Sequence, residues 1–372
     1  MSRKQQLLKR HRRNKRLALL AGLAGLVALG LATWWWLPLL LLPLLWAAHE
    51  AWFADHLFYT PGEDYAYDFG EHTRPVAARL QAGLLKADCV LQGGETLVLE
   101  LHIKSSWLGR FLDPRVELLA GEQADQQTFE RGVAGLRYLN LTGLAAPLQA
   151  GTLRLRGRHC RLLGQPRLWI TPEVELQRRR VMVIAPHADD AELAAYGLYS
   201  QAQEAWVVTL TAGEIEAEHY RQMGLGKAEA ARLKGRLRAW DSIAVPRWAG
   251  VAESRCVQLG YFCLQLPAMQ AAPDRPAASR EADMADIRPF RPQLSADQAW
   301  APCSLVLDLA SQRDKAMALG MMHDLQPPAP FKRRLRRLLQ RWLAGRRPSP
   351  YGENEFFRKA VRRHELFWRR EL

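Results

Sequence analysis

The longest apolar stretch of the chain spans residues 17–48, where no residue is charged. A half rich in leucine, alanine and glycine is followed by three tryptophans at positions 34–36, and then by a second apolar half with two prolines. One bilayer crossing takes about 20 residues, and tryptophan favours the membrane interface. The pattern predicts a transmembrane segment, either one helix or a tight hairpin that turns at the tryptophans. A cleaved signal peptide would be shorter and would end at a cleavage site of small residues, which is absent here.

A second pattern, the alternation of apolar and polar residues, begins after residue 67. Residues 96–103 (Thr-Leu-Val-Leu-Glu-Leu-His-Ile) alternate as a half-buried strand does. The same pattern recurs at residues 115–119, 137–141, 152–155 and 168–171, with glycine or proline between the segments. Several short strands at this spacing are typical of a small antiparallel sandwich. We therefore expect an all-β, sandwich-like domain over residues 67–175.

A third pattern alternates buried strands with helices. Residues 181–185 are a continuous apolar run, residues 206–210 (Trp-Val-Val-Thr-Leu) are mostly apolar, and residues 227–241 have the composition of a helix. Strands and helices in this order form a right-handed parallel sheet. We expect an α/β domain with a Rossmann-like parallel sheet over residues 180–330, and ligands in such sheets collect at the carboxyl ends of the strands.

Basic residues gather at the two ends of the chain. The formal net charge is +14, with eight Lys or Arg in residues 1–16 and fourteen in residues 331–372. A central region without a basic excess argues against a nucleic-acid-binding groove. The basic first segment predicts a cytoplasmic N-terminus at the inner (plasma) membrane. Residues 331–372 predict basic amphipathic helices that contact anionic membrane lipids.

The membrane side of the folded body stays open at this point. No Lys or Arg occurs between Ala48 and Arg74, which favours a single crossing with the body outside the cytoplasm. The basic C-terminal helices favour the cytoplasmic leaflet instead, and with it the hairpin.

The five cysteines show no Cys-x-x-Cys spacing, so a zinc ribbon or a thioredoxin-type site is not supported. Buried, unreactive thiols are expected. Cys89 and Cys160, both in strand-like segments, would be able to pair if that region lay outside the cytosol.

The loop after the apolar run 181–185 carries the candidate chemistry. Its sequence, Pro186-His187-Ala188-Asp189-Asp190-Ala191-Glu192, closely resembles the Pro-His-Pro-Asp-Asp-Ala-Glu signature of the PIG-L/LmbE-type deacetylases. Residues 211–214 (Thr-Ala-Gly-Glu) resemble the second strand end of that family, and residues 228–232 and 243–245 resemble its following helix and turn. The resemblance covers residues 180 to about 265 and implies a zinc enzyme that removes N-acetyl groups from sugars.

Carried over residue by residue, the resemblance implies that His187 and Asp190 bind Zn²⁺ and that Asp189 is the general base. Zinc lowers the pKa of a bound water towards ~7 and polarises the acetamide carbonyl. Asp189 would take the proton of that water.

The third zinc ligand of the family comes from a later histidine loop that has no counterpart in this sequence. Residues 305–309 and 311–315 resemble the helices that should stand on either side of that loop and its strand, and here they are adjacent. His219 or His323 is the candidate substitute ligand. Cys263 occupies a position where the family usually has Asp.

These features give two functional hypotheses. The first is a membrane-anchored, zinc-dependent deacetylase whose partners are an N-acetylated envelope sugar or glycolipid of the lipopolysaccharide type, and membrane lipids, but no nucleic acid. The second is a catalytically impaired, deacetylase-like protein that acts as a glycan-binding or scaffold module. For the second, basic side chains on one strand would contact an anionic glycan or merely be solvated: Arg154, Arg156, Arg158 and Arg161.

Overall fold

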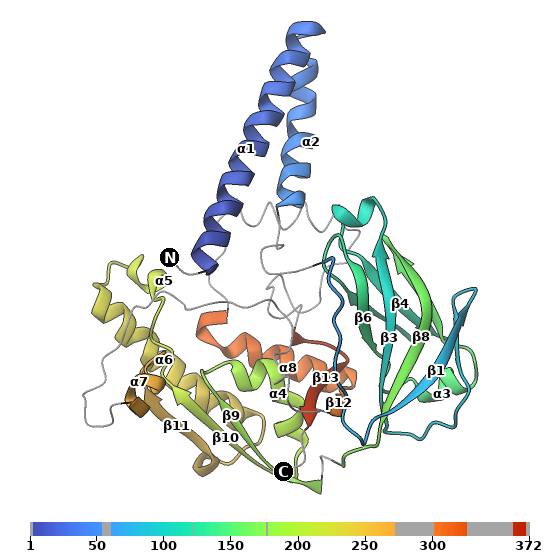
Figure 1. Ribbon diagram of the computed structural model, residues 1–372. Coiled ribbons are helices and arrows are strands. Elements are labelled where there is room, and N and C mark those ends of the chain that lie inside the picture. Colours follow the sequence, from blue (N-terminus) through green and yellow to red (C-terminus); the bar gives the residue numbers. More distant parts are fainter. Residues whose placement is uncertain are drawn as a thin grey trace.

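The computed structural model describes residues 3–53, 61–121, 123–175, 178–271, 301–325 and 360–369. Within these residues the chain forms a helical hairpin, a large antiparallel sheet and a smaller part with a parallel sheet and helices (Figure 1). The segment 272–300 and the greater part of the predicted basic helices over 331–372 lie outside the described residues.

The hairpin consists of α1 (Arg3–Ala32) and α2 (Leu37–Trp52), which run antiparallel beside each other (Figure 1). The ring Nε2 of His49 lies 2.8 Å from the carbonyl oxygen of Lys15, so these two residues lie at the same height along the hairpin axis. The rings of Trp34 and Trp36 stack at the turn. The part of α1 from Lys9 to Ala32 is long and apolar enough to cross a membrane, and a signal sequence near an N-terminus would have the same properties.

The large sheet has eight strands in the order β5-β4-β7-β2-β1-β8-β3-β6. Every recorded pairing in it is antiparallel. The short helix α3 (Ala145–Gln149) connects two of the strands. The strands are β1 (Arg74–Gln81), β2 (Leu84–Ala87), β3 (Thr96–Ser105), β4 (Arg115–Ala120), β5 (Gln123–Thr128), β6 (Ala134–Asn140), β7 (Arg154–Arg158) and β8 (Cys160–Thr171).

This sheet nearly closes into a barrel, so the predicted sandwich of two facing sheets is wrong. The edge strands β5 and β6 meet through the Gln127 side chain, whose Nε2 donates to the Asn140 carbonyl oxygen (2.7 Å) and whose Oε1 accepts the Asn140 backbone N–H (2.9 Å). The pairing of β3 with β8 shifts register between Glu100 and His102, and such irregularities bend a strand. One curved sheet therefore surrounds the core that two sheets were expected to enclose.

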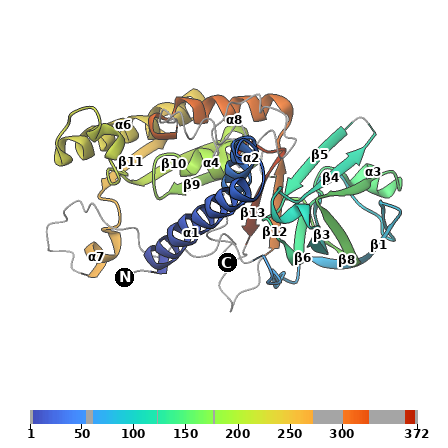
Figure 2. The same ribbon diagram turned by 90° about the horizontal axis from the view of Figure 1, so that it is seen from above.

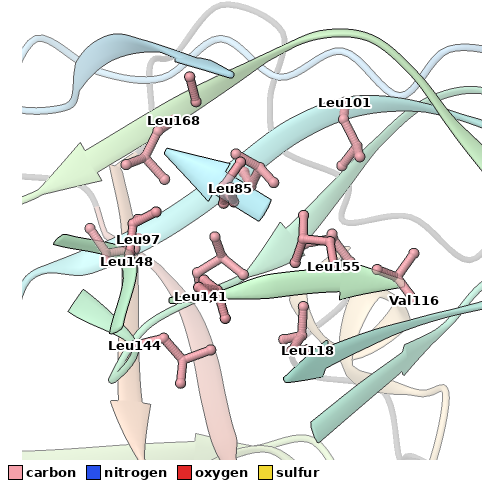
Figure 3. Close-up of a cluster of buried hydrophobic side chains, with 14 of the residues drawn as sticks. Leu85, Leu97, Leu101, Val116, Leu118, Leu141, Leu144, Leu148, Leu155 and Leu168 are labelled. Atoms are coloured by element: carbon pink, nitrogen blue, oxygen red, sulfur yellow. The ribbon is translucent and has the colours of Figure 1, made fainter. Parts of the chain in front are cut away.

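The barrel core consists mostly of leucine side chains that point to its axis (Figure 3). Leu85, Leu97, Leu99 and Leu139 are fully buried. The alternation seen along residues 96–103 thus marks the inward face of β3, as the sequence predicted. Cys89 and Cys160 in this part are free thiols, and no disulfide joins them.

The second sheet is parallel but has three strands among the described residues, in the order β11-β10-β9. The prediction of a Rossmann-like sheet is therefore wrong, although the strand–helix alternation that led to it is present. The strands are β9 (Arg180–Ala185), β10 (Glu204–Thr211) and β11 (Cys256–Tyr261), and the helices are α4 (Asp190–Gln201), α5 (Glu218–Arg221), α6 (Lys227–Trp248), α7 (Leu266–Ala271) and α8 (Leu309–Met321).

An antiparallel pair replaces the further parallel strands that were expected. It joins β12 (Ala301–Val306) to β13 (His364–Arg369). Residues 305 and 306 end a strand here, and helix α8 follows from Leu309, whereas the sequence predicted a helix over 305–309. Residues 364–369, expected in a C-terminal helix, instead pair with β12 as strand β13.

The pair β12–β13 lies between the barrel and the helices when the molecule is seen from above (Figure 2). The backbone N–H of Ser304 donates to Thr96 Oγ1 (2.9 Å), and Asn140 Nδ2 donates to Ser304 Oγ (2.9 Å). Trp368 stacks on Phe69 of the barrel side. The β12–β13 pair therefore connects the barrel to the smaller part, where Glu365 of β13 contacts α4.

Candidate metal and acid–base site

The candidate site is the loop between β9 and α4, at the carboxyl end of β9. Pro186 and His187 follow the strand directly, and α4 begins at Asp190. Thr211 at the end of β10 fixes the loop, because its hydroxyl (2.8 Å) and its backbone N–H (3.1 Å) both donate to the Pro186 carbonyl oxygen. The predicted strand–loop–helix unit is present, and the loop lies where ligands of parallel sheets collect.

His187 and Asp190 lie side by side in this loop. The His187 ring Nδ1 is 3.0 Å from Asp190 Oδ2, and the His187 backbone N–H donates to the same oxygen (2.9 Å). Both side chains are only partly exposed. The sequence spacing of three residues thus brings an imidazole nitrogen and a carboxylate oxygen together.

The other ring nitrogen of His187 faces a cysteine. Its Nε2 lies 3.2 Å from the Sγ of Cys263, which is buried. The loop that carries Cys263 is held by Glu214, whose carboxylate accepts the Cys263 backbone N–H (3.1 Å). Hydrogen bonds to Asp190 and then to Cys263 raise the pKa of His187 to about 10. Asp190 and Cys263 therefore occupy opposite edges of one imidazole ring.

Asp189, between the two metal-ligand candidates, points to α6 instead. Its Oδ1 accepts a hydrogen bond from Arg238 Nη2 (3.0 Å), and the same guanidinium donates to the Ala188 carbonyl oxygen. Asp189 has a φ of 112°, a left-handed conformation that is strained for any residue except glycine. Burial raises the pKa of Asp189 to about 6, against the opposing effect of Arg238.

Arg238 continues into a polar network that the sequence did not predict. Its Nη1 donates to Asp324 Oδ2 (2.9 Å), which also lies 3.2 Å from Lys234 Nζ, and Tyr220 donates to Asp324 Oδ1 (2.7 Å). Burial alone would raise the pKa of Asp324, but these partners lower it overall. The network joins α5, α6 and the turn after α8 behind Asp189. Nothing in the sequence marks Arg238 among the many other arginines of the chain.

The structure does not bring His219 or His323 into a group with His187. His219 is exposed on α5, with its ring against Tyr220. The ring Nδ1 of His323 lies 2.6 Å from Asp241 Oδ1, and Asp241 Oδ2 accepts the His323 backbone N–H. In the described part of the chain, no three or more His, Cys, Asp or Glu side chains are placed to hold one metal ion.

A buried carboxyl lies beneath the loop and was not singled out in the sequence. Glu192, on the first turn of α4, is 1% exposed, and its Oε1 accepts a hydrogen bond from Tyr199 (3.2 Å). Burial raises the pKa of Glu192 to about 7. The sequence signal for Glu192 was its position at the end of the Pro-His-Ala-Asp-Asp-Ala-Glu stretch.

Two of the three arginines on β7 share one carboxylate. Arg156 Nε donates to Glu117 Oε2 (2.6 Å), and Arg158 Nε donates to Glu117 Oε1 (3.1 Å). These hydrogen bonds lower the pKa of Glu117, although its burial would raise it. The strand of arginines is thus partly satisfied within the barrel, which leaves less charge for an anionic glycan.

Comparison with protein-family models, with curated protein sequences and with solved structures finds no match to this chain. The interpretation of the site therefore depends on its own chemistry. That chemistry is an imidazole and a carboxylate in contact, a second carboxylate held by a buried arginine, and a thiol on the far edge of the imidazole.

Proposed function

We propose that this protein is a membrane-anchored hydrolase that removes N-acetyl groups from an envelope sugar or glycolipid of the lipopolysaccharide type, with Zn²⁺ as its cofactor. The observation that carries the proposal is the contact between His187 and Asp190 at the carboxyl end of β9, with Asp189 between them in the chain and held by Arg238. The resemblance of this loop to the PIG-L/LmbE-type signature supplies the class of reaction and substrate.

The donor atoms fit two positions of a zinc site. Zinc takes neutral imidazole nitrogen and carboxylate oxygen, and the Nδ1 of His187 lies 3.0 Å from Oδ2 of Asp190. Zinc binding there would displace the proton that these two atoms share. When bound there, zinc would polarise the acetamide carbonyl and acidify a water molecule. Cys263 contacts the opposite ring nitrogen, so it is not placed to complete the same ion.

Asp189 is the proposed general base. Arg238 engages its Oδ1, which leaves Oδ2 to accept a proton from the attacking water. Burial raises the pKa of Asp189 to about 6, which makes its carboxylate a stronger base than that of an exposed aspartate. The hydrogen bonds of Arg238 to Asp189 and to the Ala188 carbonyl fix the direction of the carboxylate.

One observation favours the second candidate, a deacetylase-like module that binds glycans or acts as a scaffold without hydrolysis. Catalytic zinc sites usually have three protein ligands, and the described residues contain no group of three. A two-ligand site would bind zinc weakly.

Metal content and amide hydrolysis separate the two candidates. The full chain, purified in detergent, is expected to carry one zinc and to release acetate from an N-acetylglucosamine glycolipid. Asp189→Asn should lower the rate by about 100-fold or more with zinc retained, because a general base contributes at least that much. Asp88→Asn, at an exposed carboxylate paired with Arg79, is the matched control. Wild-type protein with neither zinc nor acetate release would overturn the hydrolase, and binding of the same glycolipid by that protein would then support the second candidate.

A further inference from the structure

The two N-terminal helices are packed as membrane helices pack, through small residues. A Cβ atom on Gly22 would lie 2.8 Å from the Leu45 side chain, and one on Gly30 would lie 3.0 Å from the ring of Pro38. Small residues at contact points let helix backbones approach closely in a bilayer. The hairpin is thus a packed unit, and its two helices have a fixed antiparallel arrangement.

The outer surface of this hairpin is apolar and uncovered. Large side chains along both helices are exposed, including Leu31 (85%), Leu44 (65%) and Trp35 (77%). Contiguous apolar surface of this extent is rare on soluble proteins and marks a site for lipid or protein. The uninterrupted absence of charge over residues 17–48 fits lipid acyl chains as the occupant.

Charge orients the hairpin. The segment 1–16 carries eight basic residues, which keeps that end of α1 on the cytoplasmic side. The contact between His49 and the Lys15 carbonyl places the end of α2 at the same level. With its 16 residues, α2 is about 24 Å long, short of the roughly 30 Å of hydrocarbon that a full crossing requires.

We propose that α1 and α2 form a membrane hairpin with both ends on the cytoplasmic face, so that the barrel and the candidate site lie in the cytoplasm. This decides between the two topologies that the sequence leaves open. The chain enters the bilayer at residue 17, turns at the three tryptophans and leaves beyond Ala48. If the proposed function also holds, the substrate is presented by the cytoplasmic leaflet.

Labelling with a membrane-impermeant maleimide tests this topology without reference to activity. Val90 in the barrel part is 74% exposed, so Val90→Cys offers a reactive thiol there, and Ser2→Cys marks the N-terminus. Both variants of the full chain are expected to label only after the cells are permeabilised, above the background of wild-type protein. Labelling of Val90→Cys in intact cells would overturn the proposal, as would recovery of the full chain from cells without detergent.

A deletion of residues 37–48 in the Val90→Cys background serves as the matched comparison. It leaves one crossing after the same basic segment, so the body should move to the outer side and label in intact cells. Should this variant fail to accumulate, the comparison of Val90→Cys with Ser2→Cys in the full chain still decides the question. Absence of zinc or activity would not affect either result, so failure of the proposed function is recognised separately.

Discussion

The barrel and the parallel-sheet part differ in the kinds of side chain that they bury. The barrel encloses a core made mostly of leucine, although Arg137 is also buried there and pairs with Glu130. The parallel-sheet part buries charged groups close to its candidate site, among them Glu192, Arg238 and Lys315. The barrel is thus stabilised mainly by packed apolar side chains, whereas the parallel-sheet part buries several charged side chains that hold one another in fixed positions.

The buried pair Lys315–Glu365 shows the second strategy most clearly. The two side chains are 1% and 2% exposed and lie 2.7 Å apart. Glu365 also accepts the backbone N–H groups of Gly197 and Leu198 on α4, and Lys315 donates to the Leu193 carbonyl oxygen. This pair therefore ties β13 and α8 to the helix that begins in the candidate site.

Breaking that pair should have the largest effect on stability. Lys315→Met leaves a buried carboxylate without its cation, which typically lowers the free energy of unfolding by about 3–5 kcal/mol. Urea unfolding of the full chain in detergent, followed by circular dichroism, measures the loss. Lys86→Met, at an exposed position on β2, is the control. A loss below about 1 kcal/mol would show that buried charge does not support this part.

The matching change in the barrel is Leu139→Ala on β6. Leu139 is fully buried in the leucine core, and a cavity there should lower the free energy of unfolding by about 3 kcal/mol. Hydrogen exchange should locate the loss in the barrel strands and leave α4 protected. Leu163→Ala, at a 43% exposed position on β8, should have little effect. Equal loss of hydrogen-exchange protection in the barrel and in α4 would show that the two parts do not differ in this way.

A smaller effect is expected where the barrel closes. Gln127→Leu removes both hydrogen bonds to Asn140 and leaves a backbone N–H and a carbonyl without partners, at a cost of about 1–2 kcal/mol. Gln126→Leu changes the exposed neighbour and should be close to neutral. Differential scanning calorimetry of the two variants decides this, and equal melting temperatures would mean that the side-chain contact does not close the sheet.

The smallest expected effect is the pH dependence of stability that comes from β13, the strand between the two parts. Burial lowers the pKa of His364 on β13 from 6.5 to about 4. Between pH 6.5 and pH 4 the unfolded chain therefore binds a proton at His364 that the folded chain does not bind. The free energy of unfolding is highest above pH 6.5 and falls as the pH drops towards 4. The expected loss between pH 8 and pH 6 is roughly 0.8 kcal/mol. His364→Phe should reduce this dependence, and an unchanged pH profile would refute it.

The sequence predicted local structure better than the way that distant segments meet. Residues 96–103 alternate because one face of β3 is buried, so the strand was evident from its own residues. The edge strands of the barrel are bridged by the Gln127 side chain, and no local pattern marks that residue. Likewise β12 and β13 are far apart in the chain. The partner strand of residues 364–369 is therefore not visible in the neighbouring sequence, which by itself predicts a helix there.

The candidate site divides in the same way. His187, Asp189 and Asp190 are adjacent in the chain, and their spacing in a strand–loop–helix unit was sufficient to propose them. Arg238 and Cys263 reach the loop from α6 and from the turn after β11. Their contribution depends on tertiary packing, which periodicity and composition do not encode.

The left-handed backbone of Asp189 has a consequence for substitutions at this position. Glycine would adopt this conformation without strain, but Asp189→Gly would also remove one of the two carboxylates that pair with the buried Arg238. Taking one partner away from a buried ion pair is costly. The strain at residue 189 is thus opposed by the ion pair that the same residue makes, so glycine would exchange one cost for another.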